Sequence, residues 1–356
     1  MIKTQTEDRN NSLFMIRRLT VSDAPALPPL PDEGREECDN NAANPEGLDK
    51  IDRHTFVSCQ EISYNELEFS SPKKLLGRGS SAAVIYARYR QQPVAIKEVT
   101  GNFFSIDENT DTLKNECEKL SDFDHPNILK LYGWVKGPRF SLVLEFQPFD
   151  LFTVIKKVGD RTVDYVQIGH DIVTALDAMH KKNMIHRDVK IENILMNTDG
   201  HAKLCDFGFA ARLGPDGVIF AKKLMGTPAY MAPEVIREKK YSTQSDMYAF
   251  GIAWWEMLSH FSFMSRYSRT QEGIIPFVLA GVREIIPDDC DPDVAELIVR
   301  CWDGLPEMRP GAAEVREVLS RKLHNRDKEN IERCRFFQGK RDRDESIPGE
   351  FRRLVM

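Results

Sequence analysis

The chain has 356 residues, of which 41% are hydrophobic and 29% are charged, and its formal net charge is −6. This composition is typical of a soluble globular protein large enough for one two-lobed domain with tails, or for two small domains. The acidic balance predicts no general affinity for nucleic acid. No apolar run approaches the roughly 20 residues that a membrane-spanning helix needs, so no membrane insertion is expected.

The first residues and the cysteines predict the cellular location. Ile2 stands where myristoylation requires a glycine, and Asp8 and Arg9 interrupt any apolar core of a signal peptide. The seven cysteines are scattered without a C-x-x-C pair, which is typical of reduced thiols rather than of disulfides or a zinc site. We therefore expect a cytoplasmic protein, with the nucleus as the alternative.

Residues 1–60 are polar and poor in periodic hydrophobic positions, so we expect a disordered N-terminal segment. Residues 24–31, APALPPLP, could bind a polyproline-recognising module, although no arginine adjoins them and a plain linker is the simpler interpretation. We expect any regulatory partner to bind this segment. Residues 323–356 are dense in mixed charges and predict a solvated C-terminal tail.

Between these tails, strand-like patterns give way to helical ones. In the first half, segments of alternating apolar and polar residues are separated by turn residues, and one segment has helical periodicity. The second half has mainly helical periodicity. The predicted strands are 75–88, 92–99, 129–134 and 140–146, and the predicted helices are 112–123, 162–182, 245–259, 293–302 and 311–323.

Residues 76–84, LGRGSSAAV, follow the pattern of a phosphate-binding glycine loop, with Ala82 in place of its third glycine. Gly77 and Gly79 would let backbone amides approach phosphates without a side chain in the way. Taken alone, the same residues also suit an ordinary glycine hairpin.

Lys97 closes an apolar strand, V-A-I-K at 94–97. Burying its ammonium group costs free energy unless negative groups surround it. The alternatives are therefore a snorkelling surface lysine and a lysine held by phosphates and a helix glutamate. Glu116 is the expected partner, because it begins a helix face that continues with Leu120, and Glu118 is the second choice.

Residues 186–193 read HRDVKIEN, and a dozen residues later 206–208 read DFG. The first string places a base and a metal-binding amide on one tight loop, and the second places a carboxylate beside a glycine. With the glycine loop and Lys97, this order and spacing resemble the catalytic core of the eukaryotic protein kinases. The motifs cover about three quarters of the chain.

The resemblance implies an α+β, bilobal protein kinase fold. It has a small antiparallel β-sheet N-lobe with one main helix and a larger, mostly helical C-lobe. The expected kinase domain spans 61–322, with the N-lobe at 61–146 and the C-lobe at 147–322, between the disordered segment 1–60 and the tail 323–356.

The resemblance also implies roles for individual residues. Asp188 would accept or orient the substrate hydroxyl proton, Lys190 would stabilise the γ-phosphate, and Lys97 with Glu116 would hold the other phosphates of ATP. Asn193 and Asp206 would bind Mg²⁺, with Mn²⁺ as an alternative. Leu144 falls at the gatekeeper position. The expected nucleotide-binding residues are Leu76, Gly77, Arg78, Gly79, Ser80, Val84, Ala95, Lys97, Glu145, Gln147 and Leu195.

Lys190 and Thr227, the latter in GTPAYMAPE at 226–234, match the serine/threonine kinases, and the resemblance implies that Thr227 hydrogen-bonds near Asp188 and Lys190. Y-A-F-G at 248–251, C-W at 301–302 and R-P at 309–310 resemble the tyrosine-kinase-like group, whose members mostly phosphorylate serine and threonine. The implied function is ATP-dependent phosphorylation of serine and threonine in protein substrates, in signalling. The alternatives are a pseudokinase acting as a scaffold or binding module, and dual specificity that includes tyrosine.

Four longer-range contacts are also expected from the resemblance. Glu234 should pair with Arg309, and Asp246 should cap the backbone of the catalytic loop. Two packed groups should align the lobes and enclose the adenine. The first consists of Leu120, Leu131, His186 and Phe207, and the second of Val84, Ala95 and Leu195.

Residues 209–225 depart from the pattern, because they contain no serine, threonine or tyrosine to carry an activating phosphate. Arg187, which such a phosphate would pair with, then needs another anion. Asp216 is the only acid in the stretch, and it is either a weak clamp for Arg187 or simply part of a turn. Cys205 is expected to line the nucleotide pocket, as a small buried hydrophobe or as a reactive thiol.

Overall fold

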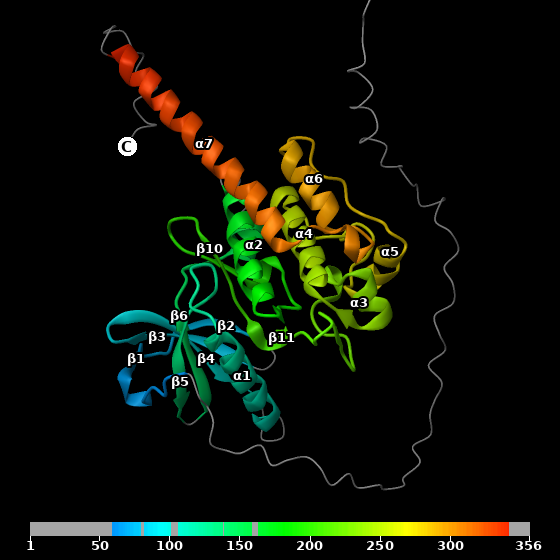
Figure 1. Ribbon diagram of the computed structural model, residues 1–356. Helices are drawn as coiled ribbons and strands as arrows, with labels where there is room; N and C mark the ends of the chain where they lie inside the picture. Colours follow the sequence, from blue (N-terminus) through cyan, green and yellow to red (C-terminus); the bar gives the residue numbers. More distant parts are fainter. Residues whose placement is uncertain (1–58, 80–81, 101–105, 138, 159–162, 342–356) are drawn as a thin grey trace, which may run out of the picture.

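The computed structural model describes residues 59–79, 82–100, 106–137, 139–158 and 163–341. A sheet-containing lobe precedes a helical lobe along the chain (Figure 1), so the predicted α+β, bilobal architecture is confirmed. Within the described ranges, no helix combines the length and the apolar character needed to cross a membrane.

The small lobe is an antiparallel sheet in the order β1-β3-β4-β6-β5, with β2 paired to β3. In β4, Val94 and Ile96 belong to one hydrophobic cluster, while Ala95 between them belongs to the core that includes α1. Both faces of the sheet are therefore covered. The elements are a 3₁₀ turn at Tyr64–Glu66, β1 Leu67–Phe69, β2 Leu75–Arg78, β3 Ala82–Tyr89, β4 Gln92–Val99, α1 Ile106–Ser121, β5 Leu131–Lys136 and β6 Phe140–Glu145.

The large lobe is built around α4, in which every residue from Ser245 to Met257 is buried. A helix buried on all sides forms the centre of a domain, so its polar residues can position loops from below. The helices are a π-helix Thr153–Val158, α2 Tyr165–Lys181, α3 Pro233–Glu238, α4 Thr243–Ser259, α5 Ile275–Leu279, α6 Pro292–Cys301 and α7 Ala312–Arg341. The 3₁₀ turns are Ile191–Asn193, Phe207–Phe209, Pro228–Tyr230, Glu272–Ile274 and Pro306–Met308. The strands are β7 Phe149–Asp150, β8 Met184–Ile185, β9 Ile194–Met196, β10 Ala202–Leu204, β11 Ala211–Arg212, β12 Ile219–Phe220 and β13 Lys240–Tyr241.

Some predicted boundaries differ from the structure. Helix α1 begins at Ile106 rather than at 112, and α7 continues to Arg341 rather than ending at 323. Half of the added residues of α7 are charged, so hydrophobic periodicity misses them, although arginine, lysine and glutamate are good helix formers. Residue 162 at the start of one predicted helix, and the expected disordered segment as far as residue 58, lie outside the described residues.

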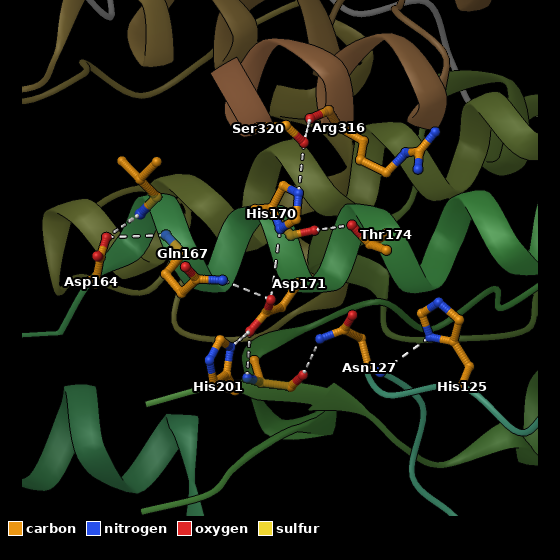
Figure 2. A network of polar contacts seen from close by, with 12 residues as sticks. His125, Asn127, Asp164, Gln167, His170, Asp171, Thr174, His201, Arg316 and Ser320 are labelled. Carbon is orange, nitrogen blue, oxygen red and sulfur yellow. Dashed lines mark hydrogen bonds and ion pairs between the residues drawn. The ribbon is translucent and has the colours of Figure 1, made fainter. Parts of the chain in front are cut away.

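A polar network around Asp171 connects α2 to the strand that leads to the DFG residues (Figure 2). The Asp171 carboxylate accepts hydrogen bonds from Gln167 on its own helix and from the backbone N–H of Ala202, at 2.9 Å each. Asn127 donates to the carbonyl oxygen of Ala202 at 3.1 Å. Burial favours the neutral carboxyl, but His170, the backbone N–H of Ala202, His201 and Gln167 hold the pKa of Asp171 below its ordinary value. The network fixes β10 on the large lobe.

Glu234 and Arg309 form the predicted buried ion pair. Both guanidinium NH groups bind the carboxylate, at 2.7 and 2.8 Å. The Arg309 side chain is 0% exposed and that of Glu234 is 11% exposed. Arg309 also donates to the carbonyl oxygens of Gln244 and Asp303. The pair therefore holds the start of α3 against the loops on either side of it.

Breaking this pair should destabilise the large lobe. Glu234→Ala or Arg309→Ala should each lower the free energy of unfolding by about 3 to 5 kcal/mol, because a buried charge is left without its partner. Replacing both with apolar residues should cost less. Glu314→Ala is the control, because its pair with Arg300 is exposed and should contribute less than about 1 kcal/mol. Urea denaturation of wild type and the four variants measures the difference. Equal stability of wild type, Glu234→Ala and Arg309→Ala would contradict the expectation.

Candidate active site

The catalytic loop is held from below by Asp246 of α4. Its carboxylate accepts hydrogen bonds from the backbone N–H groups of His186, at 2.8 Å, and Arg187, at 2.9 Å. His180 lies 3.0 Å away on the same carboxylate. Although the group is buried, these partners hold the pKa of Asp246 below its ordinary value. The expected cap is confirmed, and it fixes the backbone immediately before Asp188.

Asp188 lies at the centre of a compact polar group. Thr227 donates to its Oδ1 at 2.7 Å, and Lys190 Nζ lies 2.7 Å from its Oδ2. Lys190 also donates to the hydroxyl of Thr227 at 2.8 Å. The predicted contact of Thr227 with Asp188 and Lys190 is confirmed, and it joins the 226–234 loop to the catalytic loop.

Lys97 joins the two lobes. Its ammonium lies 2.7 Å from both carboxylate oxygens of Glu116 on α1 and 3.0 Å from Asp206 Oδ1. Burial opposes the charge on Lys97, but the two carboxylates outweigh it and raise the pKa of the lysine. The partner of Lys97 is therefore Glu116 and not Glu118, as predicted.

Asp206 and Asn193 have the oxygen atoms that a divalent metal ion requires. Lys97 holds the pKa of Asp206 below its ordinary value despite burial, so this carboxylate is ionised at neutral pH. The Asn193 amide nitrogen donates to Asp188 O at 2.9 Å and to Asp188 Oδ2 at 3.0 Å. The amide oxygen of Asn193 is therefore the atom left for a ligand. A carboxylate and an amide oxygen suit a hard cation.

The glycines at positions 77 and 79, at the turn between β2 and β3, are better explained by the approach of a phosphate than by a need of protein packing. Among the described residues, a Cβ atom added to Gly77 would meet nothing within 4 Å, and one added to Gly79 would meet only Ala82 O, at 3.6 Å. Protein packing therefore does not demand these glycines, and the turn is free to approach a ligand. Arg78 closes β2, Leu76 is 39% exposed, and Ser80 lies outside the described residues.

The other expected nucleotide residues lie around the junction of the lobes. Val84 faces Lys97 across the sheet, and Ala95 faces Leu144. Leu195 belongs to β9 and packs against the same core. The backbone N–H of Glu145 donates to Lys130 O at 2.9 Å, so an adenine contact at Glu145 falls to its carbonyl oxygen. Gln147 follows β6 and is half-buried. The binding roles of these residues stay predictions.

Arg187 does not pair with Asp216, so the suggested clamp is wrong and the turn alternative holds. Asp216 is exposed in a turn closed by a 3.0 Å hydrogen bond from Gly217 N to Gly214 O. Arg187 Nε instead donates to the carbonyl oxygen of Phe209 at 2.5 Å. Its guanidinium lies 5.4 Å from the ring centre of Tyr241. An arginine without an available anion is satisfied by a carbonyl and an aromatic face.

The packing expectations hold at the DFG phenylalanine. The rings of His186 and Phe207 meet edge to face at 5.3 Å. Leu120 and Phe207 belong to the same buried cluster, with Leu131 packed against it. Phe123, which was not predicted, lies 5.8 Å from Phe207. Burial raises the pKa of the Cys205 thiol, which favours the plain packing interpretation of this residue over a reactive thiolate.

Sequence reasoning missed three residues that shape the site. Tyr230 donates to Glu256 at 2.5 Å, and this buried glutamate also accepts from Phe263 N. The hydroxyl of Tyr241 bonds to the backbone of Met225. A single glutamate within the apolar run of α4 was a signal for Glu256, because a buried carboxyl needs donors. Tyr241 lies in a polar run and gave no such signal.

Comparison with known proteins agrees with this geometry. The protein kinase domain family matches residues 70–319. The chain is 28% identical over 276 residues, 74% of its length, to a probable serine/threonine-protein kinase of Dictyostelium discoideum, of which the match covers 20%. It is 30% identical over 291 residues to the dual specificity protein kinase shkB of the same organism, covering 78% of this chain and 44% of that protein.

It is also 29% identical over 275 residues to mitogen-activated protein kinase kinase kinase 7 of Homo sapiens, covering 74% of this chain and 43% of that protein. The last similarity supports the resemblance to the tyrosine-kinase-like group. The chain spans less than two thirds of the length of these relatives.

Removing the central charged groups should abolish phosphoryl transfer. Lys97→Met, Asp188→Asn and Asp206→Asn should each lower kcat at least about 100-fold, because each removes a charge placed for the transition state. Lys181→Met is the control, because this lysine of α2 is 64% exposed and its one ion pair within the described ranges is with Asp177. Initial rates with labelled ATP measure the effect, and circular dichroism checks folding. Wild-type rates in all three variants would show that these residues do not form an active site.

Proposed function

The chain belongs to the protein kinase family, and on this premise we propose that it transfers the γ-phosphate of ATP to serine and threonine hydroxyls of protein substrates. The observation that carries the proposal is the contact of Thr227 and Lys190 with Asp188. Asp188, the catalytic base, is thereby positioned beside the ammonium group of Lys190 and next to the 226–234 loop, where a substrate hydroxyl group can be placed.

The residues divide the chemistry among them. Asp188 orients the substrate hydroxyl and accepts its proton, while Lys190 stabilises the charge that develops on the transferred group. Lys97 binds phosphate oxygens and is kept in place by Glu116. Asp206 and the amide oxygen of Asn193 would hold Mg²⁺, with Mn²⁺ as an alternative, and the metal ion would neutralise phosphate charge.

Two alternatives differ in what they require. A pseudokinase scaffold would not need Lys97, Asp188 and Asp206 together, and all three are present with their partners. Dual specificity has one specific support, the names of two relatives that are 30% identical to this chain. Lys190 and Thr227 favour serine and threonine. A cytoplasmic or nuclear location and a regulatory partner of the N-terminal segment are further proposals, supported by the sequence composition alone.

The products should be phosphoserine and phosphothreonine. Lys190 and Thr227 motivate this expectation, because they lie on both oxygens of Asp188. The test is phosphoamino-acid analysis after incubation of purified protein with a mixed peptide library, labelled ATP and Mg²⁺, with Asp188→Asn as the blank. Predominant phosphotyrosine would overturn the serine/threonine assignment, and comparable amounts of all three would establish dual specificity.

Activity should not depend on phosphate in the segment 209–225, which has no hydroxyl side chain. Arg187 is satisfied there by Phe209 and Tyr241. Enzyme treated with phosphatase, and shown by intact mass to be unphosphorylated, should keep most of its initial rate. Loss of most activity, with recovery on rephosphorylation, would contradict the expectation.

A further inference from the structure

The segment 209–225 is held at its beginning and along its course by backbone contacts. Arg187 binds Phe209 O, and β11 pairs with β8 immediately afterwards. Further along, β12 pairs with β13, with Ile219 opposite Tyr241. None of these contacts requires the charge of an added phosphate, so the unmodified segment is already ordered by its own contacts.

The end of the segment depends on one side chain. The hydroxyl of Tyr241 accepts a hydrogen bond from Met225 N at 2.7 Å and donates to Met225 O at 2.9 Å. One hydroxyl therefore binds both the backbone N–H and the backbone carbonyl oxygen of Met225. Tyr241 is 2% exposed, so water cannot readily replace these bonds.

Met225 is immediately followed by the residues that meet the catalytic loop. Gly226 has a φ of +104°, and a Cβ there would lie 2.3 Å from Arg187 O. The backbone of the two loops is therefore in close approach at this point, and only glycine fits. Thr227 comes next and bonds to Asp188. A shift of Met225 would be passed directly to Thr227.

The ring of Tyr241 acts on the other side of the same junction. It lies beneath the guanidinium of Arg187, 5.4 Å from its centre. One tyrosine thus contacts the arginine before the base and the residue before the substrate loop. We propose that Tyr241 is a positioning residue that holds Thr227 against Asp188 and does the ordering work of an activating phosphate. The inference deepens the proposed kinase function and rests on it.

Tyr241→Phe removes the hydroxyl and keeps the ring. It should lower kcat for a peptide substrate about tenfold, the order expected for losing one or two buried hydrogen bonds. The affinity for a fluorescent ADP analogue and the fraction of protein that binds it should not change, because the contacts of Tyr241 within the described part of the chain are with Met225, Arg187 and Ile219, none of them an expected nucleotide residue. Tyr248→Phe is the matched control: this tyrosine of α4 is 0% exposed, and its hydroxyl has no hydrogen-bond partner among the described residues.

A second measurement reads the order of the segment without requiring activity. Trypsin cuts after the exposed Lys222 and Lys223 only when the local backbone opens. Native cleavage there should be about tenfold faster in Tyr241→Phe than in wild type or Tyr248→Phe, on the same reasoning. The proposal would be overturned if Tyr241→Phe had the same cleavage rate and kcat as Tyr248→Phe. It would also be overturned if the loss of kcat in Tyr241→Phe were matched by an equal loss in the fraction of protein that binds the ADP analogue. If wild type transfers no phosphate, the proposed function fails, while the trypsin comparison still decides whether Tyr241 orders the segment.

Discussion

The contact of Lys97 with Glu116 and Asp206 is the constraint on which the two-lobed arrangement depends. It joins β4, α1 and the residue before the Phe207–Phe209 turn, and therefore both lobes, through one ammonium group. Coulomb attraction is strongest in the pair of Lys97 with Glu116, because these side chains are only 16% and 4% exposed. The same lysine holds the pKa of Asp206 below its ordinary value. The hydrophobic core that runs through both lobes supports this contact but does not specify it.

Around this contact, the catalytic groups are held by short-range bonds to rigid elements. Asp246 on the buried α4 fixes the loop before Asp188, and Asp171 on α2 fixes the strand before Asp206 (Figure 2). Tyr241 fixes the residues before Thr227. Each of these holders is a buried polar side chain that binds backbone N–H or C=O groups, so each is both satisfied and directional. An ordered segment therefore needs no phosphate on residues 209–225.

The sequence predicted those parts of the site that are written as local strings. HRDVKIEN, DFG and VAIK placed Asp188, Asn193, Asp206 and Lys97, and helix periodicity selected Glu116. The pair of Glu234 and Arg309 required the resemblance, because 75 residues separate its members. What could not be predicted were contacts between a side chain and a distant backbone, such as Tyr241 with Met225. The suggested pairing of Arg187 with the carboxylate of Asp216 was wrong, because the carbonyl oxygen of Phe209 and the ring of Tyr241 already satisfy the guanidinium.

The central inference is that the unphosphorylated chain already holds its catalytic groups in the arrangement described. The most direct measurement is a crystal structure of phosphatase-treated protein with a non-hydrolysable ATP analogue and Mg²⁺. It should show Lys97 within hydrogen-bond distance of Glu116, Thr227 bonded to Asp188, and β12 paired with β13. A displaced α1 with Glu116 away from Lys97, or a segment 209–225 detached from Tyr241, would contradict the account.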